Sequence, residues 1–298
     1  MLNVPPVTAY LNGRFAPLDQ LQVSVLDRGF LFGDGVYEVI PVYDRQPFRL
    51  TEHLNRLATS LESVRIPNPH TPAEWAAIIG ELIAKQASAD QSVYLQVTRG
   101  PAWPRNHAFP AKVEPTVFLF ADPLTPPAPA LVENGVVAAT MADIRWLRCN
   151  VKAISLLANV LARQHGVDEG VAETILLRDG LLIEGSASNI FIVKNGVIAA
   201  PPPSHLMLTG ITYDLIIELA RQHGMPIEIR EVSETELRDA NEVWLSSSSR
   251  EVLAVVSLDG RPVGNGTPGP IYRAIYRHYQ AFKAGVMRIG HDRPLDQT

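Results

Sequence analysis

The chain has 298 residues, of which 46% are hydrophobic and 19% charged, and its formal net charge is −5. This composition suits a globular protein of one large or two smaller domains, and the net charge gives no reason to expect a nucleic-acid partner, which favours a basic face. Cys149 is the single cysteine, which excludes an internal disulfide and favours a cytoplasmic location, and the sequence predicts neither a signal peptide nor a membrane span.

The first 122 residues predict a small domain that mixes strands and helices. The strand-like runs are TAYLNGRFA around an Asn-Gly turn, VYEVIPVY, SVYLQVTRG and TVFLFA. Between them, Thr51–Val64 and Pro72–Ala87 carry apolar residues at helical spacing, and Thr51 is a candidate N-cap.

Residues 123–134 continue the proline-rich run DPLTPPAPA and predict a stiff linker, because proline neither continues a helix nor pairs inside a sheet. Residues 135–298 predict a larger domain. Its expected elements are a strand in GVVAATM, a helix over Val151–His165, hairpins at Asp179-Gly180 and Asn195-Gly196, a helix in GITYDLIIELARQHG, a strand in EVWLS, a hairpin at Asp259-Gly260 and a helix over Pro270–Ala284. Because strands and helices mix without strict alternation, we predict an α+β fold in two domains.

Lys152 is the lysine for which the sequence offers no simple structural role. Lys85 and Lys283 lie near helix C-termini, Lys112 lies in a loop, and Lys194 lies beside a turn. Lys152 begins a predicted helix, where the positive end of the dipole disfavours a cation, and it follows an apolar tract. Both effects lower the pKa of an amine and favour Schiff-base chemistry; the alternative is a lysine that extends its ammonium to solvent.

A second set of residues suits an aromatic cofactor with a phosphate. Glu184 ends a strand, and its carboxylate either decorates an exposed turn or points inward to bind a cationic ring nitrogen. Gly210, Ile211 and Thr212 open a helix whose first N–H groups either suit a phosphate or are simply capped. Arg56 would add positive charge, although a helix arginine is usually solvated.

Several motifs occur in the order seen in fold-type IV pyridoxal-phosphate aminotransferases: DRGFLFGDGVYEV, YLQVTRG, RNHAFP, DIRWLRCNVK, EGSASN and GIT. The resemblance runs from about Tyr10 to about Val256 and is strongest to the bacterial members that act on D-amino acids. It implies a small α/β domain, a larger domain with a barrel-like sheet, and pyridoxal 5′-phosphate as cofactor. It also implies a homodimer with a shared active site.

The resemblance also implies roles for single residues. Lys152 is the Schiff-base lysine and general base, and Glu184 is the partner of the pyridine nitrogen. The phosphate ligands so implied are Arg56, the backbone of Ile211 and Thr212, and Ser249. The implied reaction is ping-pong transamination between a D-amino acid, such as D-alanine, D-glutamate or D-aspartate, and a 2-oxo acid such as 2-oxoglutarate or pyruvate.

Arg105 and His107 form an R-x-H pair on a loop, so that both side chains can converge on one carboxylate. The resemblance implies that this pair and Tyr37 bind the substrate α-carboxylate, with the loop contributed by the neighbouring subunit. A basic surface loop without a ligand and a carboxylate ligand at Arg99 are the alternatives. VYEVIPVYD has no arginine before Arg45, which favours D-amino-acid substrates over the L-branched-chain ones of other relatives.

Other functions on the same scaffold stay open at this point. They are aminodeoxychorismate lyase, branched-chain L-amino-acid aminotransferase and, from a different class, a non-enzymatic binding protein. Trp103, Ala187 and Tyr213 depart from the pattern of the relatives without removing a catalytic group. No metal site is predicted.

Overall fold

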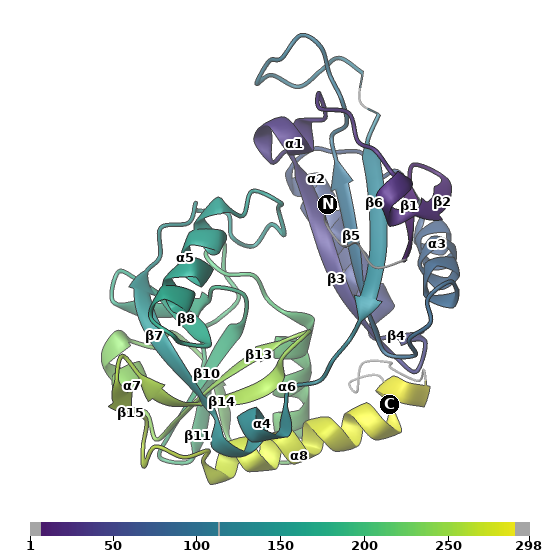
Figure 1. Cartoon of the computed structure of the whole chain (residues 1–298). Coiled ribbons are helices and arrows are strands. Elements are labelled where there is room, and N and C mark those ends of the chain that lie inside the picture. The colour runs from purple at the N-terminus through teal and green to yellow at the C-terminus, as the bar shows by residue number, and fades with distance from the viewer. Residues whose placement is uncertain (1–6, 113, 290–298) are drawn as a thin grey trace. The chain divides into compact units, whose positions relative to one another are not determined.

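The computed structural model describes residues 7–112 and 114–289, which divide into two compact units (Figure 1). One unit holds the described residues up to Thr125, the segment Val151–Leu156 and residues 286–289. The other holds Pro126–Asn150 and Leu157–Gly285. The segment that carries Lys152 therefore belongs to the first unit.

The first unit is built on an antiparallel sheet with the strand order β2-β1-β6-β5-β3-β4. Its strands are β1 (Thr8–Leu11), β2 (Arg14–Pro17), β3 (Gly35–Tyr43), β4 (Gln46–Pro47), β5 (Gln91–Thr98) and β6 (Thr116–Pro123). Asn12 and Gly13 both have positive φ in the turn between β1 and β2, which confirms the hairpin predicted from the Asn-Gly pair.

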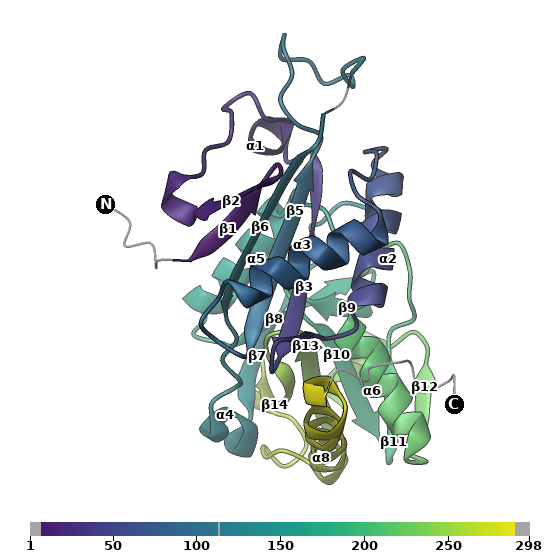
Figure 2. The same cartoon turned by 90° about the vertical axis from the view of Figure 1, so that its right-hand side faces the viewer.

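Two helices, α2 (Leu50–Ser63) and α3 (Pro72–Ala84), pack on this sheet, and Figure 2 shows α3 crossing the strands. Val93, Leu95 and Val97 are alternate residues of β5 and have no exposed surface, as the two-residue repeat of a strand requires. The remaining helical segments are η1 (Leu18–Gln20), α1 (Arg28–Phe32) and η2 (Met287–Ile289).

Both predicted helices are present, but the cap expected at Thr51 is wrong. The N-cap of α2 is Arg49, whose left-handed φ of 46° turns the chain into the helix without a side-chain hydrogen bond. In α3, by contrast, Thr71 caps the helix and forms a capping box with Glu74.

The second unit contains a nine-stranded sheet with the order β12-β11-β10-β13-β14-β7-β8-β9 and β15 beside β14. Its strands are β7 (Val136–Ala142), β8 (Glu173–Arg178), β9 (Leu181–Gly185), β10 (Asn189–Lys194), β11 (Val197–Ala200), β12 (Ile227–Ile229), β13 (Glu242–Ser247), β14 (Glu251–Leu258) and β15 (Arg261–Pro262). The turns at Asp179-Gly180, Asn195-Gly196 and Asp259-Gly260 all have two positive φ values, which confirms the three predicted hairpins.

This sheet curls because a short link joins strands that are distant in its order. β9 and β10 are five strand steps apart, which is about 24 Å in a flat sheet. The link from Gly185 to Asn189 spans at most about 15 Å. The sheet must therefore bend, and its concave side holds a core that includes Ile175, Ile190 and Leu245. The barrel-like sheet of the prediction is confirmed.

Helices α5 (Leu157–Asp168), α6 (Ile211–Gln222) and α8 (Pro270–Gly285) pack on the second sheet. Helices α4 (Pro129–Asn134) and α7 (Glu234–Arg238) contribute Val132 and Leu237 to the core on its concave side. The rings of Phe191 and Trp244 stack 4.9 Å apart, and Tyr213 of α6 packs 5.1 Å from Phe191. Among the described residues, no helix combines the length and the apolar character that a membrane span needs.

The helix predicted over Val151–His165 begins instead at Leu157. Residues before it run along β3, where Ala153 forms a bridge with Val36 and the Lys152 carbonyl accepts a hydrogen bond from Tyr37 N at 2.9 Å. Val151 and Ala153 are buried in the first unit's core, so their apolar character serves that core and not a helix. Lys152 therefore does not lie at a helix N-terminus, and the helix-dipole argument for it is wrong.

Leu57 of α2 is fully buried, and replacing it with alanine should lower the free energy of unfolding by about 2–5 kcal/mol. The measurement is the urea midpoint followed by tryptophan fluorescence, because Trp75 lies in the same core. Val25→Ala is the control, since this side chain is 70% exposed and its loss should cost less than about 0.5 kcal/mol. Equal shifts of the urea midpoint in the two variants would contradict the placement of Leu57 in the core.

Candidate active site

Lys152 is held in the first unit by its backbone, and its amine lies over an aromatic ring. The Lys152 N–H donates to Ser60 Oγ of α2 at 3.3 Å, and its Nζ lies 4.2 Å from the centroid of the Tyr37 ring. Val151 and Ala153 are buried in the core, whereas Lys152 between them is partly exposed.

Lys152 differs from the other lysines in having no carboxylate partner among the described residues. The other four form ion pairs, which are Lys85–Glu81, Lys112–Glu114, Lys194–Asp239 and Lys283–Glu251. An amine that no carboxylate holds is available to form a covalent bond to a carbonyl carbon. A Schiff-base lysine needs such an amine, and this role of Lys152 stays a prediction.

A buried polar cluster lies beside Lys152, between β3 and α2. Glu38 accepts hydrogen bonds from Arg56 Nε and Nη2 at 2.8 and 2.7 Å, and its Oε2 lies 2.8 Å from His53 Nδ1. Burial opposes ionisation of Glu38, but Arg56 and His53 lower its pKa to about 2. Burial lowers the pKa of His53, and the positive charge of Lys152 acts in the same direction. Sequence reasoning placed Arg56 at a phosphate and missed its partner Glu38.

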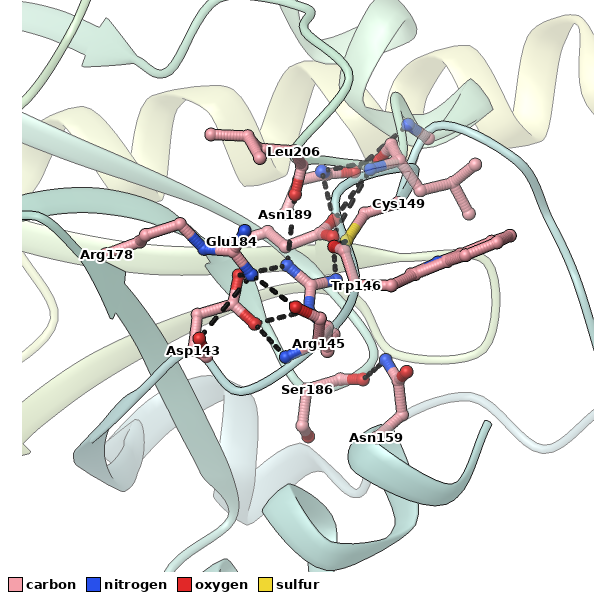
Figure 3. Close-up of polar contacts among 12 residues, drawn as sticks. Asp143, Arg145, Trp146, Cys149, Asn159, Arg178, Glu184, Ser186, Asn189 and Leu206 are labelled. Atoms are coloured by element: carbon pink, nitrogen blue, oxygen red, sulfur yellow. Dashed lines mark hydrogen bonds and ion pairs between the residues drawn. The ribbon is translucent and has the colours of Figure 1, made fainter. Parts of the chain in front are cut away.

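Glu184 lies in the second unit with an arginine directed at it (Figure 3). Arg145 Nη1 donates to Glu184 Oε1, while its Nε and Nη2 donate to Asp143 at 2.9 Å each. The Leu208 N–H donates to both carboxylate oxygens of Glu184 at 3.2 Å. Burial raises the pKa of Glu184 to about 7, and the Arg145 guanidinium and the Leu208 N–H act against this rise. The carboxyl group is thus buried and oriented, and it can bind a protonated ring nitrogen.

Asn189 connects Glu184 to the start of α6. Its Nδ2 lies 3.4 Å from Glu184 Oε2, and its Oδ1 accepts a hydrogen bond from Gly210 N at 3.1 Å. Gly210 is the N-cap of α6 and provides no side-chain cap, and the helix begins with the buried residues Ile211 and Thr212. A buried and uncapped helix start is suited to an anion. Asn189 thus links Glu184 to Gly210, the residue directly before Ile211 and Thr212.

Two serines of the second unit, Ser249 and Ser246, differ in their exposure to solvent. Ser249, a predicted phosphate ligand, lies in the exposed turn between β13 and β14 of the same unit. Ser246, which faces Asn189 across the β10–β13 pair, has a buried Oγ without a hydrogen-bond partner among the described residues. Sequence reasoning did not single out Ser246.

The R-x-H pair lies on the loop between β5 and β6, and Phe32 of α1 brings its two side chains together. Arg105 lies 4.6 Å and the His107 ring 5.2 Å from the centroid of the Phe32 ring. Both side chains belong to exposed residues. Arg99, the alternative carboxylate ligand, is only 2% exposed and donates to Asp34 and to two backbone carbonyls. Its donors are engaged inside the protein, so it does not present a carboxylate site.

Two of the departures from the pattern of the relatives now have a structural description. Tyr213 is buried, and its hydroxyl donates to the Pro201 carbonyl at 2.7 Å, so this residue supports the packing of α6. Trp103 is 79% exposed on the loop that carries Arg105.

Residues 35–258 match the family model described as Amino-transferase class IV. The chain belongs to this family. It is 39% identical over 264 residues to a D-alanine aminotransferase of Bacillus licheniformis, covering 89% of this chain and 93% of that relative. A D-alanine aminotransferase of Staphylococcus haemolyticus is 37% identical over 274 residues, with 92% and 96% covered. The predicted resemblance to fold-type IV aminotransferases is confirmed.

Solved structures give the same fold. The branched-chain amino acid aminotransferase of Escherichia coli has a TM-score of 0.87 at 28% identity and covers 93% of this chain and 94% of its own. A second branched-chain amino acid aminotransferase, solved with pyridoxamine 5′-phosphate, has a TM-score of 0.89 at 27% identity, with 98% and 96% covered. That of Thermoproteus uzoniensis, solved with norvaline, has a TM-score of 0.86 at 25% identity, with 97% of each chain covered. The chain is an aminotransferase that uses pyridoxal 5′-phosphate, as predicted.

The side chains that the structure presents fit this cofactor. Lys152 has an amine without a carboxylate partner among the described residues, Glu184 is a buried carboxylate, and α6 begins without a side-chain cap. These features match, in turn, a carbonyl carbon, a protonated pyridine nitrogen and a phosphate.

The raised pKa of Glu184 predicts a pH dependence of stability in the cofactor-free protein. Between its usual value of 4.5 and its folded value of about 7, the folded protein keeps a proton that the unfolded chain has lost. The free energy of unfolding should therefore fall as pH rises through this window, by roughly 3 kcal/mol at most.

Glu184→Gln should remove this part of the pH dependence, because glutamine does not titrate. Urea unfolding at about pH 5 and about pH 7.5 measures it, with the exposed Glu133→Gln as control. An unchanged pH slope in Glu184→Gln would show that the carboxyl group titrates normally.

Proposed function

We propose that this chain transfers amino groups between D-amino acids of the D-alanine, D-glutamate and D-aspartate class and 2-oxo acids such as 2-oxoglutarate or pyruvate. The observation that carries the proposal is Lys152, whose amine has no carboxylate partner among the described residues and lies 4.2 Å from the Tyr37 ring. The relatives named D-alanine aminotransferase, at 39% and 37% identity, support the choice of D-amino acids.

When bound, pyridoxal 5′-phosphate supplies a carbonyl carbon that reacts with amines and a protonated ring that accepts electrons from the substrate α-carbon. Lys152 holds the cofactor through Nζ and, once free, uses the same atom as the general base that takes the substrate α-proton. The ring of Tyr37 keeps this amine in place, because a cation over an aromatic face is attracted to it.

The second unit supplies orientation and charge. Glu184 accepts a hydrogen bond from the ring nitrogen, while Arg145 and the Leu208 N–H keep its carboxylate fixed. The N–H groups of Ile211 and Thr212 bind the phosphate together with Ser249, and Arg56 of the first unit adds positive charge to its binding. Such groups act most strongly when they are ordered before the substrate arrives.

Arg105, His107 and Tyr37 bind the substrate α-carboxylate in this proposal. Arginine suits the task because its planar fork matches the two carboxylate oxygens. We infer a homodimer in which this loop serves the active site of the neighbouring subunit. The exposure of the loop supports this inference, as does that of Phe30 and Trp103, at 75% and 79%.

A branched-chain L-amino-acid aminotransferase is the second candidate, because solved structures with the same fold bear that name. Half-reactions with D-alanine, D-glutamate, L-leucine and L-valine separate the two functions, with the cofactor absorbance as the readout. Faster conversion by L-leucine than by any D-amino acid would overturn the proposal. Pyruvate release from aminodeoxychorismate, without transfer to 2-oxoglutarate, would indicate a lyase.

Lys152→Ala should give a folded protein without measurable transamination, because both the attachment point and the proton carrier are lost. Steady-state turnover of D-alanine with 2-oxoglutarate is the measurement, and circular dichroism checks the fold. Lys85→Ala is the control, since this lysine pairs with Glu81 on the surface of α3. Near-normal turnover in Lys152→Ala without added amine would refute the assignment.

Arg105→Met should weaken the reaction with every D-amino acid alike, by roughly 10- to 100-fold in kcat/KM, because a charge-assisted hydrogen bond is worth about 1.5–3 kcal/mol. Ethylamine, which is D-alanine without the carboxylate, should lose little. The exposed Arg14→Met in the first hairpin is the control. If only the acidic substrates suffer, Arg105 reads the side chain and not the α-carboxylate.

A further inference from the structure

The guanidinium of Arg28 is bound to the backbone of the loop that carries the R-x-H pair. Its Nη1 donates to the carbonyls of Asn106 and Ala108 at 2.5 and 3.4 Å, and its Nη2 donates to the carbonyl of His107 at 3.1 Å. These three carbonyls belong to consecutive residues directly after Arg105. Arg28 itself is only 4% exposed, so one buried side chain fixes the path of the segment.

Asp34 holds Arg28 from the opposite side. Its Oδ2 accepts a hydrogen bond from Arg28 Nε at 2.8 Å. Arg99 donates to both oxygens of the same carboxylate, at 2.8 and 3.0 Å, and lies 3.7 Å from the centroid of the Phe109 ring. Burial opposes ionisation of Asp34, but the two guanidinium groups lower its pKa. Arg28 and Arg99, which both touch the loop, therefore share one ionised carboxylate.

The backbone of Arg28 is also fixed at the ends of β5 and β6. Its N–H donates to the Gly100 carbonyl at 3.0 Å. The preceding Asp27 caps α1 through Gly29 N at 2.7 Å and accepts a hydrogen bond from Thr116 Oγ1 at 2.6 Å. The same short helix carries Phe32, against which the Arg105 and His107 side chains lie. This segment thus provides both a clamp on the loop backbone and a support for its side chains.

We propose that Arg28, anchored by Asp34, is a positioning residue that orders the carboxylate-binding loop before the substrate arrives. The proposal rests on the proposed function, in which Arg105 and His107 bind the substrate α-carboxylate. Arg28 acts through the loop backbone and through Phe32, since its guanidinium also lies 4.8 Å from the centroid of that ring. If the clamp is lost, the loop must be ordered when the substrate binds, so KM rises while the chemical step keeps its rate.

Arg28→Lys tests this arrangement in the cofactor-loaded enzyme. Lysine keeps the positive charge beside Asp34, but its single ammonium cannot reproduce the planar fork that reaches three carbonyls. We expect a KM for D-alanine that is roughly 10- to 100-fold higher, the effect of losing one charge-assisted hydrogen bond, with kcat within about threefold of normal. Amide hydrogen exchange over residues 105–109 should also become faster.

Arg45→Lys is the matched control. The guanidinium of Arg45, in the turn between β3 and β4, also donates to three backbone carbonyls, those of Ile83, Gln86 and Ala87, each at 3.2 Å. This variant loses an equivalent clamp in the same unit but leaves the R-x-H loop unchanged, so its KM should stay normal. An equal rise in KM in both variants would overturn the proposal in favour of a general loss of stability.

Asp34→Asn provides a second variant, which weakens the hold on Arg28 without touching its bonds to the loop. It should show the same faster exchange over residues 105–109 and a raised KM with a normal kcat. Normal amide hydrogen exchange and a normal KM in both Arg28→Lys and Asp34→Asn would overturn the proposed role of Arg28.

Arg105→Met, assayed beside these variants, separates the two proposals. If its KM for D-alanine is normal, the carboxylate role of the loop is wrong, and with it the effect of the clamp on substrate binding. If the KM of Arg105→Met is raised but Arg28→Lys has a normal KM and normal amide hydrogen exchange, only the proposed role of Arg28 is wrong. The double variant Arg28→Lys/Arg105→Met should raise KM by less than the product of the two single effects, because both changes act on the same loop and only His107 remains to be ordered. Fully additive effects would exclude a route through the loop.

Discussion

The extended path of Val151–Leu156 along β3 is the constraint on which the active site depends. The bridge between Ala153 and Val36, and the hydrogen bond from Tyr37 N to the Lys152 carbonyl, add this segment to the first unit. Side-chain alternation then sends its apolar residues into the core and the lysine over the Tyr37 ring. A helix in this place would have turned the same residues around an axis and given the amine a different environment.

A lysine without a carboxylate partner requires that nearby carboxylates are already engaged. In the cluster beside Lys152, Arg56 performs this task at Glu38, and its fork satisfies both oxygens at once. Arginine also pairs with other buried carboxylates in each unit. The pairs are Glu38–Arg56, Asp34 with Arg28 and Arg99, Glu184–Arg145, and Glu173–Arg250. Because each of these carboxylates pairs with a guanidinium, burial does not leave it without a cationic partner. The chain's preference for arginine over lysine thus has a physical use.

Several parts of the fold and site could be predicted because they depend on neighbouring residues in the sequence. The Asn-Gly and Asp-Gly turns specify hairpins since both positions need positive φ, and the start of α6 at Ile211 follows from Gly210 and the apolar spacing after it. The motif order was sufficient for the family, which the match over residues 35–258 confirms. For Glu184 the structure decides between the two predicted alternatives, because its carboxylate is buried and not exposed in a turn. Its role toward the cofactor stays a prediction.

The sequence by itself therefore determined the hairpins, most helices, the family and the cofactor, because each rests on local backbone preferences or on a run of adjacent residues. Only the tertiary structure decided where the helix after Lys152 begins, since Val36 and Tyr37 compete for that backbone from more than a hundred residues away. It also decided the partners of Arg28, Arg99 and Arg145. The sequence does not show where an arginine side chain points. The carbonyls and carboxylates that accept its hydrogen bonds come together only when the strands and loops that carry them are packed.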